Sequence, residues 1–534
     1  MKRLIPDVSR RTLLAWVGKT AGAAAMYQAM TQLGFAEEST YDANFALSAA
    51  PRGTRVLVLG AGVAGMTAAY ELRKAGYQVQ VLEYNAKAGG RCWTLRGGDR
   101  FTELSGITQA CEFDPGLYFN PGPWRIPYHH YAVLDYCKRF GVQLEAFVQY
   151  NYNALAHSTQ AFGGKPQRLR EIQADFQGHI AELLSKAVGQ NALSDAVSAE
   201  DCERLLDVLG QWGALDAKGK YRSSPQASAR RGYRTDPGGG LMPRAVDSQP
   251  MAGPQLLDSN LWQGMLEAQT YEYHTTLFQP VGGMDQVARA FERQVGELIR
   301  YNSKVTAIHQ DAKGVSVTFV DRLAPETSQQ VHADWCVCTL PLSILGQLPV
   351  TVSEPMEEAI RAVPYDAAFK VGLQFKRRFW EQDENIYGGV SNTDQPIQNI
   401  GYPCTDYGKP GKGVLLGGYA FSSGAYEFTA MPPAERIRQA LEQGAQLHPQ
   451  YRTEFDNGIA VGWHRVPWTN GCYGIWTEDT RQRYYKTLCQ IDGRIVLAGE
   501  HASFIPAWQE GAILSSLDAI SRLHTHILAS QSGH

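Results

Sequence analysis

Hydrophobic and polar positions between residues 55 and 83 predict a strand, a helix and a second strand in close succession. Residues 56–59 form a continuous apolar run, which is typical of a strand that is buried on both faces. A helical spacing of apolar residues follows as far as Leu72, and Gly76 is placed to end that helix. A second apolar run then leads to Glu83, so the stretch reads as one strand–helix–strand unit.

The turn inside this unit has the small residues of a dinucleotide-binding loop: Gly60, Ala61, Gly62, Ala64 and Gly65. Gly60 allows the tight turn, Gly62 lets the backbone approach a pyrophosphate, and Gly65 permits close packing of helix against strand. The helix N-terminus offers free N–H groups to phosphate oxygens, and the carboxylate of Glu83 can accept hydrogen bonds from a ribose diol. The alternative is a glycine-rich turn without a ligand, but the combination favours a unit that binds an ADP-containing dinucleotide.

Farther along the chain, residues 131–209 have a helical pattern, and residues 223–257 predict a long irregular connection. Strands are predicted at 304–308, 315–320, 335–342 and 494–500, and a second sheet at 365–375, 386–402 and 413–421. Helices are predicted at 287–298, 432–447 and 508–523. The strand at 335–342 is expected to return to the first sheet, and the one at 494–500 to end at the same sheet edge as Gly60.

Composition describes an ordinary globular protein of two or three domains, with 534 residues, 44% of them hydrophobic and 19% charged. A formal net charge of −3 gives no electrostatic case for binding nucleic acid or an anionic membrane. The nine cysteines lack metal-ligand spacing, so neither a metal site nor a disulfide framework is predicted. After the first forty residues no apolar stretch is long enough to span a bilayer.

The N-terminal segment, residues 1–45, is predicted to be a targeting signal and not part of the fold. The sequence SRRTLL at residues 9–14 resembles a twin-arginine export signal, and a moderately apolar stretch follows it. A periplasmic or secreted location is therefore predicted. The alternative interpretation is an ordinary basic amphipathic helix.

Two further motifs place arginines in loops rich in turn formers. Residues 88–91, AGGR, end in Gly90 and Arg91, and residues 120–127, NPGPWRIP, contain Pro123, Trp124 and Arg125. An arginine between apolar residues needs an anionic partner, because its planar guanidinium suits a carboxylate in bidentate fashion. Taken alone, Arg125 favours a structural salt bridge, and a surface loop is the alternative for Arg91.

These pieces together resemble the FAD-dependent amine oxidase superfamily and, within it, the L-amino acid oxidases. The resemblance covers most of residues 55–523 and is weakest between 140 and 266. It depends on the motifs GAGVAG, AGGR, GPWRIP, FQPVGGM, KRRFWEQD and LAGEH followed by AWQEGA.

The resemblance implies a mixed α/β (α+β) fold in which a Rossmann-like FAD-binding domain accompanies a mixed-sheet substrate domain and a helical insert. The FAD-binding domain is expected to be discontinuous, at 46–118, 275–345 and 456–534. The substrate-binding domain is expected at 119–130 and 346–455. Residues 131–274 are expected to form the helical insert and the irregular connection.

The resemblance also assigns roles to individual residues. Arg125 and Tyr402 match the residues that bind the substrate α-carboxylate, Lys370 matches a lysine that holds a water near flavin N5, and Trp508 matches an aromatic residue over the flavin ring. Glu500 falls beside the ribityl chain and pyrophosphate. The predicted FAD-binding residues are Gly60, Ala61, Gly62, Ala64, Gly65, Glu83, Gly90, Arg91, Pro123, Trp124, Arg125, Val305, Trp468, Gly499, Glu500 and Trp508.

One motif departs from the L-amino acid oxidase pattern. Residues 471–473, GCY, resemble a motif of monoamine oxidases in which the cysteine is bonded covalently to the flavin. Cys472 is therefore either such a link or a small buried thiol, and the second interpretation is favoured.

The reaction that the resemblance implies is the oxidative deamination of an L-amino acid. Hydride passes from Cα to flavin N5, water hydrolyses the resulting imine to a 2-oxo acid and ammonia, and O₂ reoxidises the flavin to give H₂O₂. A small-molecule L-amino acid and O₂ are then the partners, and a homodimer is compatible with the resemblance. The alternatives are an amine oxidase that needs no carboxylate and an amino-acid 2-monooxygenase that yields an amide. A flavin-binding scaffold and an NAD-dependent dehydrogenase match fewer of the motifs.

Overall fold

The computed structural model describes residues 41–190 and 198–532, so the twin-arginine motif and most of the predicted signal lie outside the described residues. The first sheet grows from β1 (Arg55–Leu59), which pairs in parallel with β2 (Gln78–Leu82) and β16 (Trp335–Cys338). β23 (Ile495–Leu497) lies parallel to β16, and the strand order is β12-β2-β1-β16-β23-β22. The predicted return of residues 335–342 to this sheet is confirmed.

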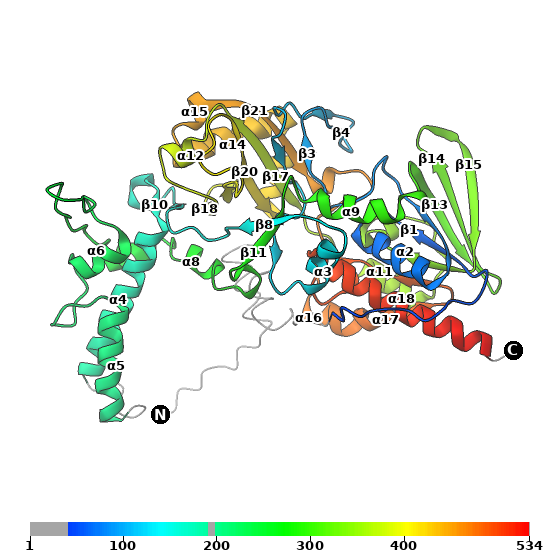
Figure 1. Cartoon of the computed structure of the whole chain (residues 1–534), viewed down its shortest axis with the longest axis horizontal. Coiled ribbons are helices and arrows are strands. Elements are labelled where there is room, and N and C mark those ends of the chain that lie inside the picture. The colour runs from blue at the N-terminus through cyan, green and yellow to red at the C-terminus, as the bar shows by residue number, and fades with distance from the viewer. Residues whose placement is uncertain (1–40, 191–197, 533–534) are drawn as a thin grey trace.

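Both faces of the first sheet are covered, which explains its continuous apolar strands. Side chains alternate along β1, so Val56 and Val58 face a core formed with four helices, whereas Leu57 and Leu59 face a three-stranded antiparallel sheet. The helices are α2 (Val63–Ala75), α3 (Tyr131–Arg139), α9 (Asp285–Val295) and α18 (Gln509–Ser532). The strands are β13 (Ser303–Gln310), β14 (Val315–Asp321) and β15 (Ala324–Ala333), visible at the right of Figure 1.

The second sheet has the strand order β10-β9-β18-β19-β20-β17-β21. Its long strands match the predicted runs at 365–375 and 413–421, whereas the run at 386–402 divides into two strands. Helices α13 (Ser422–Thr429) and α14 (Pro433–Leu447) pack against one face. The strands are β9 (Leu155–His157), β10 (Gln167–Arg168), β17 (Ala368–Phe375), β18 (Val390–Thr393), β19 (Asn399–Gly401), β20 (Gly413–Phe421) and β21 (Phe455–Gly462).

The segment 131–209 is less helical than its pattern predicts. Between α3 and α4 (Leu169–Gly189) the chain forms β8 (Leu144–Phe147) and the two strands β9 and β10, which join existing sheets. These strands have two to four residues, too few to show a period of two, so only their tertiary partners define them. The expected irregular connection also contains two short helices, α6 (Pro225–Arg231) and α7 (Gly253–Asp258).

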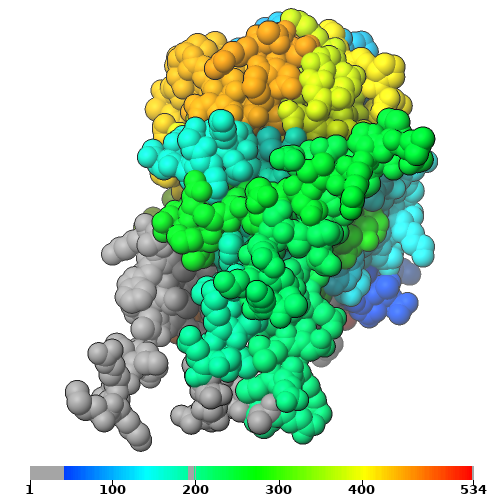
Figure 2. Space-filling view, turned by 90° about the vertical axis from the view of Figure 1, so that its left-hand side faces the viewer, coloured from blue at the N-terminus to red at the C-terminus, as the bar shows by residue number. Residues whose placement is uncertain are grey.

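The helices α4, α5 (Ala199–Trp212) and α6 form an arm that projects from the two-sheet body at the left of Figure 1. Figure 2 shows the arm in green and teal below the orange and yellow residues of the second sheet and its helices. None of the helices within residues 41–190 and 198–532 has the length and apolar character that a membrane crossing requires.

A buried ion pair ties the hairpin of β4 (Arg100–Thr102) and β5 (Thr108–Ala110) to α14. Arg436 Nη2 donates to Glu103 Oε2 at 2.9 Å, and both side chains are almost fully buried. Gln109 Nε2 donates to the other carboxylate oxygen at 3.1 Å, so the acid has three donors around it. Because the pair is removed from water, each charge depends on its partner.

We expect Glu103→Ala to destabilise the fold by about 3–5 kcal/mol, because it leaves the Arg436 guanidinium buried without a counter-charge. Glu442→Ala is the matched control, since Glu442 pairs with Arg438 on the exposed side of the same helix and should change stability by less than about 1 kcal/mol. Denaturant titration followed by circular dichroism measures both. Equal effects of the two substitutions would contradict the assignment.

Candidate functional site

The turn between β1 and α2 has the geometry that a dinucleotide-binding loop needs. Gly60 adopts a φ of +98°, and its N–H donates to the Leu82 carbonyl oxygen at 2.8 Å. A Cβ at Gly65 would lie 2.0 Å from the Gly60 carbonyl oxygen, so only glycine allows this contact between strand and helix. A Cβ at Gly62 would meet no atom of the described residues within 4 Å, which leaves open space in front of the helix.

The N-terminus of α2 is available to an anion. Among the described residues, no side chain caps it, so its first N–H groups remain free to bind phosphate oxygens. The Gly89 N–H donates to the Ala61 carbonyl oxygen at 2.8 Å, which holds Gly90 and Arg91 beside the turn. The open space and the uncapped helix fit the pyrophosphate of a dinucleotide.

Glu83 closes the far side of this turn. Its buried carboxylate accepts from the Ala61 N–H at 2.7 Å and from the Asn85 N–H at 2.8 Å, although burial still raises the pKa of Glu83. Nearby, the Trp468 ring stacks on Tyr84 at 5.0 Å between centroids, and Val305 is buried on β13. The end of β2, β13 and residue 468 therefore lie on one side of the turn, and the adenine-side contact expected of Val305 stays a prediction.

Arg91 connects the turn after β2 to the turn after β23. Its Nη1 donates to Glu500 Oε1 and to the Cys472 carbonyl oxygen, both at 2.7 Å. Glu500 follows Gly499 at the end of the late strand and also accepts from the Ala507 N–H at 3.2 Å. Burial raises the pKa of the Cys472 thiol to about 12, so this group is protonated at neutral pH.

Lys370 reaches the same region from β17. Strand alternation turns Phe369 and Val371 into the core beneath α13 and α14, so Lys370 points from the opposite face. Its Nζ donates to the Gly122 carbonyl oxygen at 2.6 Å and lies 4.3 Å from the centroid of the Tyr419 ring. Burial lowers the pKa of Lys370 to about 7.

Arg125 lies among aromatic rings just before β7 (Ile126–Pro127). Its guanidinium carbon is 4.3 Å from the centroid of the Tyr273 ring, 5.6 Å from Trp124 and 5.7 Å from Trp508. Its buried Nε has no hydrogen-bond partner, and within the described part of the chain Arg125 forms no salt bridge. The structural salt bridge that the sequence alone favours for Arg125 is therefore not formed there.

The structure does not bring the Tyr402 hydroxyl to Arg125. Tyr402 shares a sheet face with Ile400, and its hydroxyl is hydrogen-bonded to Ser391 at 2.7 Å and to His448 at 2.6 Å in the second core. Gly401, which lies between Ile400 and Tyr402 in the sequence, is the residue that lies against Trp124. The predicted role of Tyr402 at the substrate carboxylate therefore stays a prediction, and the hydrogen bonds of its hydroxyl go to Ser391 and His448.

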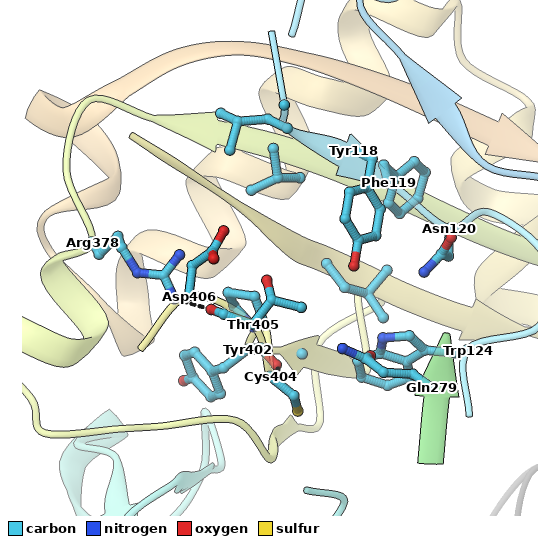
Figure 3. A pocket seen from close by; sticks show the side chains of 16 residues that line it. Tyr118, Phe119, Asn120, Trp124, Gln279, Arg378, Tyr402, Cys404, Thr405 and Asp406 are labelled. Carbon is cyan, nitrogen blue, oxygen red and sulfur yellow. Dashed lines mark hydrogen bonds between the residues drawn. The ribbon is translucent and has the colours of Figure 1, made fainter. Parts of the chain in front are cut away.

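Trp124 and Tyr402 both line a small cavity of about 70 Å³. Figure 3 shows the Tyr402 ring turned away from the Trp124 indole. Polar side chains line the cavity, including Asn120, Gln279 and Arg378. Asn120 also belongs to the Lys370 region, because its carbonyl oxygen lies 3.5 Å from Lys370 Nζ. A cavity of this size has room for ordered water.

Sequence reasoning missed two aromatic residues that the structure places at the site. Tyr419 pairs with Lys370 across β17 and β20, and the spacing along the predicted strand 413–421 could have shown it. Tyr273 contacts Arg125 from a short helical turn, Tyr271–Tyr273, just after the stretch where the resemblance is weakest. No periodic signal marks that turn.

The first sheet with its glycine turn defines a dinucleotide-binding protein, and the second sheet contributes a lysine and aromatic residues beside it. A family model refines this class, because residues 63–523 match flavin containing amine oxidoreductase. The match spans most of the chain. The protein therefore belongs to this family, and its cofactor is FAD.

Relatives and solved structures agree with the family. The chain is 28% identical over 492 residues to the L-amino-acid oxidase of Siganus canaliculatus, covering 89% of this chain and 86% of the relative. It is 28% identical over 482 residues to that of Vipera ammodytes ammodytes, covering 87% and 91%. Putrescine oxidase bound to putrescine and cyclohexylamine oxidase from Brevibacterium oxydans each superpose with a TM-score of 0.57 at 16% identity. They cover 89% and 90% of this chain and 99% of their own, and they show the shared fold.

We expect Gly65→Ala and Gly62→Ala to separate folding from cofactor retention. The added Cβ at residue 65 overlaps the Gly60 carbonyl and should destabilise the protein by about 1–3 kcal/mol. Gly62→Ala has room in the fold but fills the space in front of the helix, so it should lower bound flavin with little change in melting temperature. Thermal melts and the ratio of flavin to protein absorbance measure the two effects. A Gly62→Ala protein with full FAD would argue against the pyrophosphate site.

We expect Lys370→Met to stabilise the fold most at low pH. The pKa of Lys370 falls from 10.5 to about 7 on burial, so between these values the unfolded chain binds more protons and wild-type stability rises with pH. The advantage of the variant should therefore be greatest below about pH 7 and shrink as pH approaches the ordinary lysine value. Paired denaturation curves across this range test the expectation, and a pH-independent difference would refute it.

Proposed function

We propose that the protein oxidatively deaminates L-amino acids, forming a 2-oxo acid, ammonia and hydrogen peroxide. The proposal rests on the state of Arg125. Its buried Nε has no hydrogen-bond partner, and among the described residues no carboxylate forms an ion pair with it. A buried charge without a partner is costly, and binding an anion relieves that cost. The α-carboxylate is the anion that an L-amino acid offers. The relatives named L-amino-acid oxidases support the same substrate class.

In this proposal Arg125 binds the α-carboxylate and fixes the orientation of the substrate Cα. Tyr419 takes the place that the resemblance gave to Tyr402, since its ring lies 6.4 Å from Trp124 and beside Lys370. Trp508 closes the aromatic group around the guanidinium. Lys370, with a pKa near neutrality, holds a proton or a water at Nζ beside the reacting carbon.

We further propose that the first-sheet region holds FAD through the turn from Gly60 to Gly65, with Glu83 at the ribose and Arg91 and Glu500 near the pyrophosphate. Trp468 and Val305 lie on the adenine side. The chemistry that bound FAD supplies is hydride acceptance from Cα, followed by reoxidation with O₂. The chain's own contribution is to orient the substrate and to keep water away from it.

The rival candidates are oxidation of amines that lack a carboxylate and an amino-acid 2-monooxygenase reaction. An amine oxidase has no use for an unpaired Arg125, and a monooxygenase yields an amide in place of peroxide. We also propose export by the twin-arginine route, supported by the SRRTLL sequence at residues 9–14.

We expect Arg125→Ala to lower kcat/KM for L-amino acids by about 30-fold to 4,000-fold, which corresponds to about 2–5 kcal/mol for a lost carboxylate contact. FAD content should stay near that of wild type. Arg139→Ala is the matched control, because Arg139 pairs with Asp135 on α3, away from the aromatic group. Peroxide release and amide formation are measured with L-amino acids and with the corresponding decarboxylated amines. Near-normal amino-acid turnover by Arg125→Ala, or faster turnover of amines by wild type, would overturn the proposal.

A further inference from the structure

A second unpaired charge lies near Arg125. Glu267 is the last residue of α8 (Gln263–Glu267). Protein surrounds its carboxyl group, but the residue as a whole is only half-buried. Arg125 and Tyr273 are likewise only half-buried although protein surrounds this region. In Figure 1, α8 lies between the projecting arm and the strands β8 and β11 (Leu277–Pro280).

Two amide side chains hold the Glu267 carboxylate. Gln149 Nε2 donates to Glu267 Oε1 at 3.0 Å, and the side-chain amide of Asn392, on β18, acts on the same carboxyl group and lowers its pKa. Gln149 is only 6% exposed, and its own Oε1 is buried without a partner. The carboxylate is thus fixed in position by neutral donors that come from two different parts of the fold.

Glu267 and Arg125 influence each other without closing into a salt bridge. The positive charge of Arg125 lowers the pKa of Glu267, but burial acts more strongly and raises it overall. Tyr273 is affected by both groups: its ring centroid lies 4.3 Å from the Arg125 guanidinium carbon, and Arg125 lowers the pKa of its hydroxyl whereas Glu267 raises it. Among the described residues no ion pair includes either Arg125 or Glu267.

These unpaired groups indicate which charges a ligand should carry at its two ends. An ionised carboxylate has about four acceptor sites, and two amide donors leave part of that capacity unused. A buried charge in this state is costly unless a cation or a strong donor completes it. The unpartnered Arg125 Nε and Gln149 Oε1 are further groups that a ligand with one anionic end and one cationic end would satisfy.

We propose that Glu267 recognises the side chain of the substrate and selects L-amino acids whose side chain ends in a cation, such as lysine, ornithine or arginine. This inference rests on the proposed function, in which Arg125 binds the α-carboxylate. Gln149 and Asn392 are positioning residues, because they hold the Glu267 carboxylate toward the distal ammonium or guanidinium. Selectivity for a basic side chain follows because an apolar side chain leaves the carboxylate unpaired.

The test compares L-lysine with L-norleucine, which has the same chain without the terminal ammonium. We expect the wild-type holoenzyme to prefer lysine in kcat/KM by about 100-fold, the scale of a buried charge contact. Glu267→Gln should abolish most of this preference while turnover of norleucine stays within a few-fold of wild type. Gln149→Leu should reduce the preference in the same direction.

Glu272→Gln is the matched control, because Glu272 is a buried acid five positions along the chain that interacts with His274 and has no interaction with Arg125. It should leave the ratio of lysine to norleucine unchanged. Equal turnover of the two amino acids by wild type, or an equal loss of both in Glu267→Gln, would overturn the inference while leaving amino-acid oxidation intact. Turnover of cadaverine without turnover of any amino acid would instead refute the proposed function.

Discussion

The cofactor half of the molecule depends on the ion pair between Arg91 and Glu500, which joins residues 409 positions apart. The two turns can meet because β2 and β23 are parallel strands of one sheet, and the carboxyl ends of parallel strands share an edge. Both partners are largely withdrawn from water, so each needs the other, and breaking such a pair costs about 3–5 kcal/mol. The N–H of Ala507 and the carbonyl of Cys472 complete the contact, which fixes the loop at 471–474 beside the sheet edge.

The position of Lys370 in the second sheet depends on strand alternation in β17 and β20. Phe369 and Val371 occupy the core on one face, so Lys370 has to emerge on the other. The register then places Tyr419 directly across from it, and the buried ammonium gains the face of an aromatic ring. Desolvation lowers the pKa of Lys370 to about 7, which suits the role proposed for its Nζ in holding a proton or a water.

Local patterns predicted the long strands of the first sheet and β20, because the apolar run that marks each strand consists of residues close in sequence. The bounds of β20 match the predicted run, and the turn at Gly60 behaves as its glycines require. Tyr402 was assigned by motif matching alone, and a shift of one residue moves a side chain to the opposite face of a sheet. Tyr273 and Glu267 escaped prediction because they belong to short turns whose positions are set only by tertiary contacts.

The small sheet β7-β11-β8 explains how these unpatterned residues reach the site. Gln149 follows β8 and Tyr273 lies shortly before β11, so the antiparallel pairing of these strands places both at one end of the small sheet. Arg125 precedes β7 at the other end, and its guanidinium carbon lies 4.3 Å from the centroid of the Tyr273 ring. The arrangement keeps Arg125 and Glu267 apart, although a salt bridge between them would neutralise both charges. This separation lowers the stability of the fold, and a cluster with only a structural role would avoid that loss. In the proposed site, opposite charges held separate by rigid strands and neutral amides are preorganised, because a ligand that joins them would meet no competing salt bridge.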